Sequence, residues 1–444
     1  MMSLSSAVKT TISQALTSPA LRQLSRQSHA LRRRLSRQPA TVHYFHQVDD
    51  PYSHLTALHL EAFEAKYRVR LVPHLVPPPD AAAAPEPLKL QNWSALDAKR
   101  LARSLGLNVP DFLRQPKHNE IEAAQSALAQ VLEQARWAPK LAAISDALWR
   151  GTDLSGAGKG QNPADAGLLA HQMLESGAAL RHQWGHYLGA TFYFEGEWYW
   201  GLDRLHHLER RLGQAGLAWA NTALLPLVPA RAPVFKPIEH TSPARPVIYF
   251  YCSLRSPYTY LAAAQLRRLA EHYGAELRLC FVLPMMMRGL PVNWPKRLYI
   301  LRDTKREAER LGLPFGRIVD PLHNATERGL ALLHLAIPLG RGPALLESFL
   351  QGVFADGLDA ASEAGLLTIA ERAGLNPSQV DSALADPAWR DQASAHLQDM
   401  LARGLWGVPS FRVGNMPPVW GQDRLWMLEE DLIAALSPPV SQTA

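Results

Sequence analysis

Cysteine is almost absent from this chain of 444 residues, which contains only Cys252 and Cys280. Two cysteines exclude a disulfide framework, a cysteine-rich zinc site and a Cys-x-x-Cys redox motif, and no metal site is expected. Both cysteines lie in apolar runs of strand length, so we interpret them as small core residues. Such sparing use of cysteine suits a reducing compartment, and we expect a cytoplasmic protein.

Long hydrophobic runs are absent as well. No stretch approaches about 18 consecutive apolar residues, so no membrane-spanning helix is predicted. Hydrophobic residues make up 47% and charged residues 19% of the chain, which is the composition of a globular protein rather than a disordered one. The length indicates two or three domains.

Acidic residues are missing from residues 1–40. Without the seven basic residues of this arm, the chain has 39 basic and 40 acidic residues, so its body is nearly neutral and no nucleic-acid partner is expected. The arm has the serine- and arginine-rich composition of an organelle transit peptide, but a solvated arm or surface helix and a contact with an anionic surface are alternatives. Its basic residues are Lys9, Arg22, Arg26, Arg32, Arg33, Arg34 and Arg37.

The remainder of the chain repeats itself. VHYFHQVDDPYSHL (42–55) is similar to IYFYCSLRSPYTYL (248–261), and DAKRLARSLGL (97–107) is similar to DTKREAERLGL (303–313), both with a shift of 206 residues. A third pair, 189–209 and 407–429, lies near the end of each copy. A repeat of this kind predicts two similar domains in tandem.

We therefore expect a basic N-terminal arm at 1–40, a first domain at 41–215, a proline-rich linker at 216–244, a second domain at 245–437 and a tail at 438–444. In each copy the pattern predicts a strand, a helix, a strand, a helical block, two short strands and a final helix, which is an α/β unit with a helical insertion. The prolines of the linker indicate a stiff, extended connector.

Ser256 and Pro257 lie where the first strand of the second copy turns into a helix. Pro257 fits the first helical turn, which places Ser256 among the unpaired N–H groups at the positive end of the helix dipole. The simplest role of Ser256 is that of an N-cap. The same geometry would also stabilise a bound thiolate or another anion.

Two further segments near the end of the second copy each have a structural and a ligand-binding interpretation. In GVPS (407–410), the Val408–Pro409 bond is either a cis peptide, which would offer its backbone to an extended ligand, or part of an ordinary edge strand. In GQDR (421–424), Asp423 either caps the following helix or accepts the ammonium group of a ligand.

Taken together, these motifs resemble the thioredoxin-like family that contains the 2-hydroxychromene-2-carboxylate isomerases and the kappa-class glutathione transferases, which are relatives of the DsbA-type disulfide oxidoreductases. The resemblance covers nearly the whole second copy: YFYCSLRSPYTYL, NWPKRLYILRDTKREAERLGLP (293–314), DPLHN (320–324), GVPSF and WGQDRL. It implies two tandem DsbA-type thioredoxin-like domains, each with a helical insertion. DsbA-type enzymes begin the helix with CPxC, whereas Ser256 and Thr259 occupy both cysteine positions here, so dithiol–disulfide exchange is excluded.

What the resemblance implies for the second copy is glutathione binding, with the Ser256 hydroxyl donating to the sulfur. The backbone of Val408 and cis-Pro409 would pair with the cysteinyl unit, and Gln422 and Asp423 would hold the γ-glutamyl end. Lys296 would face the glycyl carboxylate or the acid substrate. The residues that it places near the substrate are Asn293, Tyr299 and Asp303.

The first copy departs from the family at the positions that matter. Asp50 stands in place of Ser256, Leu90 in place of Lys296 and Thr191 in place of Pro409. A carboxylate at position 50 would raise the pKa of a neighbouring thiol. We interpret this copy as a catalytically inactive partner, so a homodimer or an intrachain pseudo-dimer is the expected assembly.

The predicted function is that of a glutathione-dependent isomerase acting on a small chromene carboxylate or a similar aromatic-derived acid. One alternative is a kappa-like transferase that conjugates glutathione to electrophiles. Another is a non-catalytic thioredoxin-fold binding protein.

Overall fold

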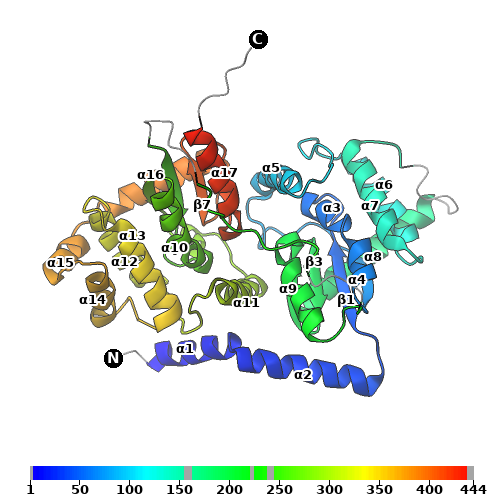
Figure 1. The fold of residues 1–444 in the computed structure, drawn as a ribbon, viewed down its shortest axis with the longest axis horizontal. Coiled ribbons are helices and arrows are strands. Elements are labelled where there is room, and N and C mark those ends of the chain that lie inside the picture. The colour runs from blue at the N-terminus through cyan, green and yellow to red at the C-terminus, as the bar shows by residue number, and fades with distance from the viewer. Residues whose placement is uncertain (1–3, 155–162, 221–224, 238–244, 438–444) are drawn as a thin grey trace, which may run out of the picture. The chain divides into compact units, whose positions relative to one another are not determined.

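The computed structural model describes residues 4–154, 163–220, 225–237 and 245–437 (Figure 1). The predicted tail at 438–444 and the linker segments 221–224 and 238–244 lie outside the described residues. The chain divides into two compact units. Unit 1 comprises Met1–Arg22, Arg231–Val292 and Ile300–Ala444, and unit 2 comprises Gln23–Ala230 and Asn293–Tyr299.

Unit 2 is built on a four-stranded mixed sheet with the order β2-β1-β3-β4. Strand β1 (Thr41–His46) runs parallel to β2 (Arg70–Leu75) and antiparallel to β3 (Thr191–Phe194), which pairs with β4 (Glu197–Trp200). Aromatic side chains such as Phe45 and Phe192 are fully buried on these strands. They supply much of the apolar area whose burial stabilises the unit.

Unit 1 contains a second four-stranded sheet with the same order, β6-β5-β7-β8. Strand β5 (Val247–Cys252) runs parallel to β6 (Glu276–Phe281) and antiparallel to β7 (Ser410–Val413), which pairs with β8 (Val419–Trp420). Both β5 and β6 begin and end 206 residues after β1 and β2. The shift found in the sequence is thus also the shift between the two sheets, and the predicted α/β fold class is confirmed.

The helices of unit 2 begin with α3 (Pro51–Ala57) and α4 (Leu60–Lys66), which follow β1, and α5 (Pro87–Ser104), which follows β2. The insertion consists of α6 (His118–Val131), α7 (Trp137–Arg150) and α8 (Pro163–Gln183). In Figure 1, α6 and α7 lie beside each other, and both α7 and α8 lie close to the elements around the sheet. Helix α9 (Gly201–Gln214) follows β4 directly and packs on it.

In unit 1, β5 leads into α10 (Pro257–His272), and the turn η1 (Met285–Arg288) and α11 (Trp294–Leu311) follow β6. The insertion comprises α12 (Asn324–Ala336), α13 (Gly342–Gln351), a short π-helix η2 (Gly352–Asp356) and α14 (Glu363–Arg372). Helices α15 (Pro377–Ala385) and α16 (Trp389–Ala402) complete it, and η3 (Gln422–Arg424) and α17 (Leu425–Leu436) close the unit. The first residues of α11, up to Tyr299, are grouped with unit 2.

The basic arm forms two helices, α1 (Leu4–Leu16) and α2 (Pro19–Ser36). In unit 1, Thr10 donates to the Ile318 carbonyl at 3.1 Å and Ser13 donates to the Gly316 carbonyl at 3.1 Å. These bonds tie α1 to the loop before α12. Among the described residues, no helix has the length and hydropathy needed to cross a membrane.

Two hydrogen bonds to buried aspartates occur at corresponding positions of both copies. Tyr52 donates to Asp97 at 2.7 Å, and Tyr258 donates to Asp303 at 2.8 Å. Each bond joins the first turn of the helix after the first strand to the helix after the second strand. The Asp303 side chain is fully buried and also accepts a bond from Arg306 at 3.1 Å.

A second repeated pair anchors the ends of the linker. Tyr67 donates to Glu209 at 3.0 Å in unit 2, and Tyr273 donates to Glu429 at 2.8 Å in unit 1. Each glutamate also accepts backbone N–H groups from the linker: Glu209 from Leu227, and Glu429 from the residues 234 and 235. The described linker residues 225–237 contain no helix or strand, so these bonds satisfy backbone groups that a ladder would otherwise pair.

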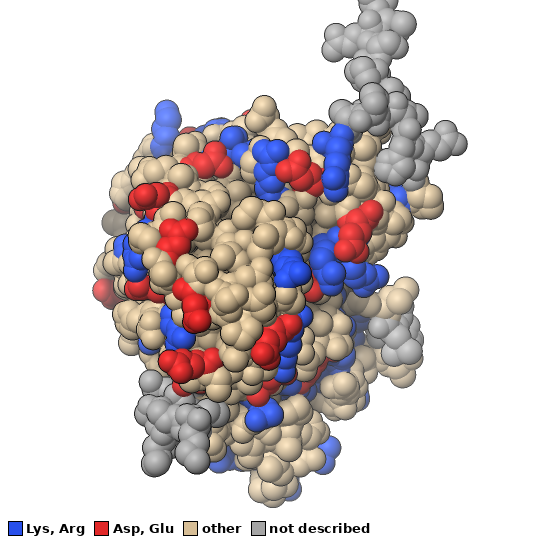
Figure 2. Space-filling model, turned by 90° about the vertical axis from the view of Figure 1, so that its left-hand side faces the viewer, with Lys and Arg blue, Asp and Glu red and all other residues tan. Residues whose placement is uncertain are grey.

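Acidic and basic side chains are interspersed on the face drawn in Figure 2, and uncharged residues cover much of the area between them. This distribution agrees with the nearly neutral composition of the chain outside residues 1–40.

Candidate active site

Ser256 occupies the N-cap of α10, as the sequence predicted, with Pro257 in the first turn. Its hydroxyl oxygen accepts the backbone N–H of Thr259 at 3.2 Å. The hydroxyl proton is donated to the Val408 carbonyl at 3.4 Å, which is long for an O–H···O bond. Because this second bond is weak, the proton can be redirected to a stronger acceptor without loss of the cap.

The acceptor Val408 belongs to a cis peptide bond. Val408–Pro409 is cis, and the following strand β7 pairs on both sides, so the alternative of an ordinary edge-strand proline is excluded. Strand β7 begins at the next residue and pairs with β5 through Ser410 and Tyr251, which brings the cis bond beside the end of β5. The N–H of Val408 has no acceptor among the residues that the structure describes, and the residue is only partly buried. A backbone donor is therefore available next to the Ser256 hydroxyl.

Gly407 is required by close packing just before the cis bond. A Cβ atom at this position would lie 2.3 Å from the ring of Trp420, too close for any other residue. Trp420 in turn stacks edge-on against Trp406, with ring centroids 4.6 Å apart. The glycine of GVPS thus lets β8 approach the segment that carries Val408.

Gln422 and Asp423 follow β8 and lie next to the cis bond through the backbone, because Gly421 donates its N–H to the Pro409 carbonyl at 2.9 Å. Gly421 has a φ of +114°, which only glycine adopts readily. Asp423 is partly exposed and its carboxylate lies 3.7 Å from the Arg424 guanidinium. Arg424, not Asp423, occupies the N-cap position of α17.

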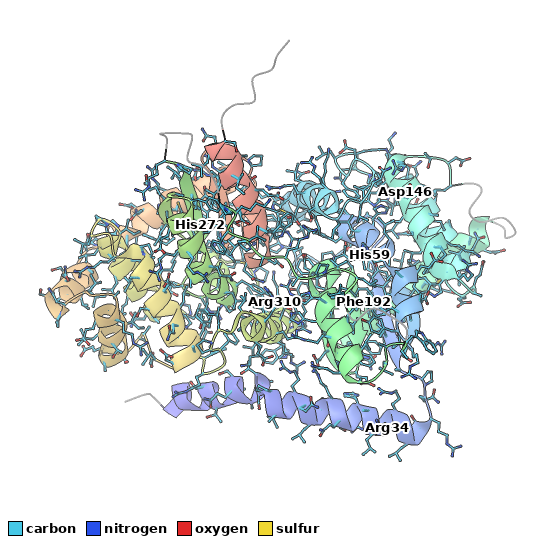
Figure 3. The ribbon with its side chains drawn as sticks, viewed as in Figure 1. Arg34, His59, Asp146, Phe192, His272 and Arg310 are labelled. Carbon is cyan, nitrogen blue, oxygen red and sulfur yellow. The ribbon has the colours of Figure 1, made fainter. Side chains whose placement is uncertain are left out.

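The Gln422 side chain is held by a residue that the sequence analysis did not identify. Its amide donates to Glu307 at 3.1 Å, and Glu307 also accepts a bond from Arg310 at 2.8 Å. Both Glu307 and Gln422 are buried. Figure 3 labels Arg310, near the end of α11.

The repeat itself contained a signal for this pair. Glu307 corresponds to Leu101 of the first copy, and Gln422 corresponds to Leu202. Both leucines are buried as well. A polar pair in one copy therefore stands where the other copy has two apolar residues, which sets the two positions apart from the shared framework.

The methionine turn η1 lies close to the same place in unit 1. Arg288 donates to the Trp406 carbonyl at 3.0 Å, two residues before Val408. Arg255, next to Ser256, contacts the sulfur of Met286 at 3.0 Å and forms a two-pronged ion pair with Asp320 at 2.6 and 2.8 Å. This turn, with its half-buried apolar side chains and a guanidinium, thus contacts residues that lie one and two positions from Ser256 and Val408 in the chain.

The remaining predicted residues are engaged by protein groups. Asp303 belongs to the Tyr258–Asp303–Arg306 set in unit 1 and is no surface residue. Asn293, Lys296 and Tyr299 are grouped with unit 2. Their contacts with a substrate or with glutathione stay predictions.

Within unit 2, the Asn293 side chain accepts the backbone N–H of Lys296 at 3.1 Å, which is a helix-capping contact. The Lys296 ammonium donates to the Ala83 carbonyl at 2.9 Å, and burial lowers its pKa. Tyr299 is 6% exposed and packs with Phe45, Val76 and Trp198. Its ring meets that of His186 edge-on at 4.7 Å.

Both cysteines are buried and unpaired, as expected of core residues. Burial raises the pKa of the Cys252 thiol well above its usual value, and burial, together with the nearby Asp399, raises that of Cys280 to about 12. Neither thiol can therefore act as a protein nucleophile near neutral pH.

At the equivalent position of the first copy, Asp50 caps α3. Its carboxylate accepts the backbone N–H groups of Tyr52 at 3.2 Å and Ser53 at 3.0 Å, and the Ser53 hydroxyl at 2.9 Å. Burial raises the pKa of Asp50 to about 7 against the opposing effect of these bonds. A capping function is thus kept in both copies, while the hydroxyl donor is present only in the second.

The comparison with known proteins also singles out the second copy. Residues 247–433 match the model of the DSBA-like thioredoxin domain family. The C-terminal half of the chain contains a DsbA-like thioredoxin domain. The sheet of unit 2 has the same mixed, four-stranded order as that of this domain.

Two curated relatives are distant homologues of the chain. The 2-hydroxychromene-2-carboxylate isomerase of Pseudomonas sp. (strain C18) is 26% identical over 191 residues, which is 41% of this chain and 88% of the relative. The enzyme of the same name from Pseudomonas putida is 25% identical over 191 residues, 41% of this chain and 92% of the relative. A solved structure of a 2-hydroxychromene-2-carboxylate isomerase is 24% identical, with a TM-score of 0.37, and the match covers 43% of this chain and all of the other.

Proposed function

We propose that the second copy, residues 245–437, binds glutathione at Ser256 and acts as a glutathione-dependent isomerase of a small aromatic-derived acid such as a chromene carboxylate. The observation that carries the proposal is the Ser256 hydroxyl, 3.4 Å from the carbonyl of the cis Val408–Pro409 bond at the N-terminus of α10. In this proposal the first copy, residues 41–215, binds no glutathione because Asp50 replaces the hydroxyl donor.

The residues present fit glutathione. Val408 offers a backbone N–H without an acceptor among the described residues, which would pair with the cysteinyl unit. Gln422, held by Glu307, and the partly exposed Asp423 would take the γ-glutamyl end. Bound glutathione would supply a nucleophilic thiolate for reversible addition to an activated double bond.

Ser256 would hold that thiolate in its ionised form. A free thiol has a pKa of about 8.5, so predominant ionisation at neutral pH requires a shift of about 1–2 units, or roughly 1.5–3 kcal/mol. A hydroxyl donor to an anion and the positive end of a helix each contribute on the order of 1 kcal/mol or more. When the Ser256 hydroxyl donates to the sulfur, it gives up only the weak bond to the Val408 carbonyl. The bond from the Thr259 N–H to the hydroxyl oxygen is kept, so the helix remains capped.

The substrate class rests on the names of the two relatives and on the surroundings of Ser256. Met286 and Arg288 on η1 border the site with an apolar side chain and a cation, which suit an aromatic ring bearing a carboxylate. Arg288 would orient the carboxylate, while η1 would exclude water from the reacting carbon atoms.

Isothermal titration with glutathione and thiolate absorbance test this function in the wild type and in Ser256→Ala. The matched control is Ser362→Ala, because Ser362 caps α14 through the Gly365 N–H at 3.1 Å and plays no part in the site. Both variants lose a cap, at a cost of about 1 kcal/mol. Loss of the thiolate signal in Ser256→Ala alone would support the proposal, and an unchanged signal, or no glutathione binding by the wild type, would contradict it.

Product analysis then separates the isomerase from a transferase. An isomerase interconverts 2-hydroxychromene-2-carboxylate and its open-chain isomer while the glutathione concentration stays constant. Stoichiometric consumption of glutathione with an electrophile, without isomerisation, would instead assign a kappa-like transferase.

A further inference from the structure

Helix α2 faces the protein with its charged side. Arg26 forms a two-pronged ion pair with Glu197 at 2.7 and 2.9 Å, and Arg33 pairs with Glu195. His29 lies on the same side, near Gly196. These three positions, at 26, 29 and 33, follow the helical repeat and define one face of α2 that is fixed to the β3–β4 turn of unit 2.

The opposite face of α2 is apolar and exposed. Its three leucines within unit 2 are 57–76% exposed, although leucine is normally among the most buried residues. With 100° per residue, their mean direction is nearly opposite to that of the inward face. We call this surface the leucine stripe: it consists of Leu24, Leu31 and Leu35.

The leucine stripe is bordered by cations. Arg32, Arg34 and Arg37 form no ion pair with any residue that the structure describes, and residues 1–40 contain no acidic side chain at all. Figure 3 labels Arg34 near the C-terminal end of α2. A second copy of this helix on the stripe would bring arginines of like charge together, whereas an anionic surface would complement them.

We propose that the leucine stripe is an interfacial membrane-binding site that lies flat on a bilayer containing anionic lipid. The leucines enter the boundary between headgroups and acyl chains, and Arg32 and Arg34 contact the lipid phosphates. The pairs of Arg26 and Arg33 with the β3–β4 turn hold the stripe outward, so binding needs no unfolding of α2.

Vesicle flotation with the full-length protein tests the proposal, using phosphatidylcholine alone and phosphatidylcholine mixed with phosphatidylglycerol. We expect binding to the mixed vesicles only. Leu24→Gln/Leu31→Gln/Leu35→Gln should lower the partition coefficient more than tenfold. Arg32→Glu/Arg34→Glu should lower it by at least about 25-fold, because each basic residue near an anionic surface contributes about fivefold.

Matched controls use other exposed residues of unit 2. Leu88→Gln/Leu96→Gln/Leu113→Gln replaces three leucines that are 50–74% exposed, and Arg103→Glu/Arg136→Glu makes the same change of net charge on exposed positions. Binding retained by both controls and lost by both stripe variants would support the proposal. Absence of binding to the mixed vesicles, equal losses in the controls, or a dimer that dissociates in the triple leucine variant would each overturn it.

Discussion

The Glu307–Gln422 pair can be exchanged for the residues that the first copy has in its place, and the exchange separates stability from ligand binding. The variants are Glu307→Leu, Gln422→Leu and the double variant, which carries the same two leucines as positions 101 and 202. If Gln422 is kept polar for a ligand, the apolar pair should suit the fold but not the function.

The expected change in the free energy of unfolding follows from the buried contact between Gln422 and Glu307. Gln422→Leu removes the 3.1 Å bond and leaves the buried Glu307 carboxylate with fewer donors. Glu307→Leu leaves the buried amide of Gln422 without this acceptor. Each single change should therefore destabilise unit 1 by about 1–3 kcal/mol. In the double variant no partner of this bond remains unsatisfied, and about 1–2 kcal/mol should be recovered.

Urea unfolding of the full chain, followed through the transition of unit 1, measures the three free-energy changes, with the transition of unit 2 as the internal control. Titration with glutathione gives the affinity. We expect the double variant to lose less stability than the sum of the two single variants, although Arg310 loses its Glu307 partner. It should bind glutathione at least about tenfold more weakly, since one hydrogen bond to a charged group contributes about 1.5–3 kcal/mol. Strictly additive destabilisation, or wild-type affinity in the double variant, would contradict the assignment of Gln422 to the ligand.

Three further predictions follow from buried groups. Burial lowers the pKa of His46 to about 3 and those of His43, His54 and His74 to about 4. Below about pH 6.5 the unfolded chain therefore binds more protons at these four histidines, which outweighs the opposite effect of Asp50, whose pKa burial raises to about 7. Unit 2 should lose stability on acidification from pH 7 to 5, and a flat urea midpoint over this range would contradict this prediction. Tyr258→Phe should destabilise unit 1 by about 1–3 kcal/mol in urea unfolding, because a hydrogen bond to the buried Asp303 is lost, whereas an effect below the experimental error would argue against this bond. Cys280, with its pKa of about 12, should resist alkylation by iodoacetamide in the native protein, as measured by mass spectrometry, and rapid labelling without denaturant would be inconsistent with its burial.

Much of the framework could be predicted from the sequence because it depends on local patterns. The repeat with a shift of 206 residues predicted both sheets, and the strands β1 and β5 begin and end with that same shift. Ser256 was predicted as an N-cap because serine before proline satisfies helix N–H groups by short-range geometry. The segment 376–404, which has few counterparts in the first copy, forms the additional helices α15 and α16.

The contacts that the sequence did not predict join residues far apart in the chain. Lys296 bonds to Ala83, and the arginines of α2 bond to the β3–β4 turn, which follows more than 160 positions later. Neither contact leaves a local pattern, since any carbonyl or carboxylate at the right place would serve. Tyr299 was placed near the substrate by a motif alone, whereas its burial with Phe45 and Trp198 depends on how the chain packs.

Comparison of the two copies within this chain distinguishes residues that the shared fold needs from residues that differ between the copies. The bonds Tyr52–Asp97 and Tyr258–Asp303 occur at matching positions, and so do the bonds of Tyr67 and Tyr273 to a glutamate. A bond kept in both copies serves the shared fold, and a contact of Asp303 with a substrate stays a prediction.

The reverse argument applies to positions at which the copies differ. In the alignment of the two copies, Ser256 corresponds to Asp50, cis-Pro409 to Thr191 and Gln422 to Leu202. The order of the strands is nevertheless the same in both sheets. These differences gather in the second copy around one point, where the end of β5, the start of β7 and the turn after β8 meet. The fold does not require these residues, since the first copy builds the same sheet without them. Their shared location supports the proposed glutathione site in the second copy.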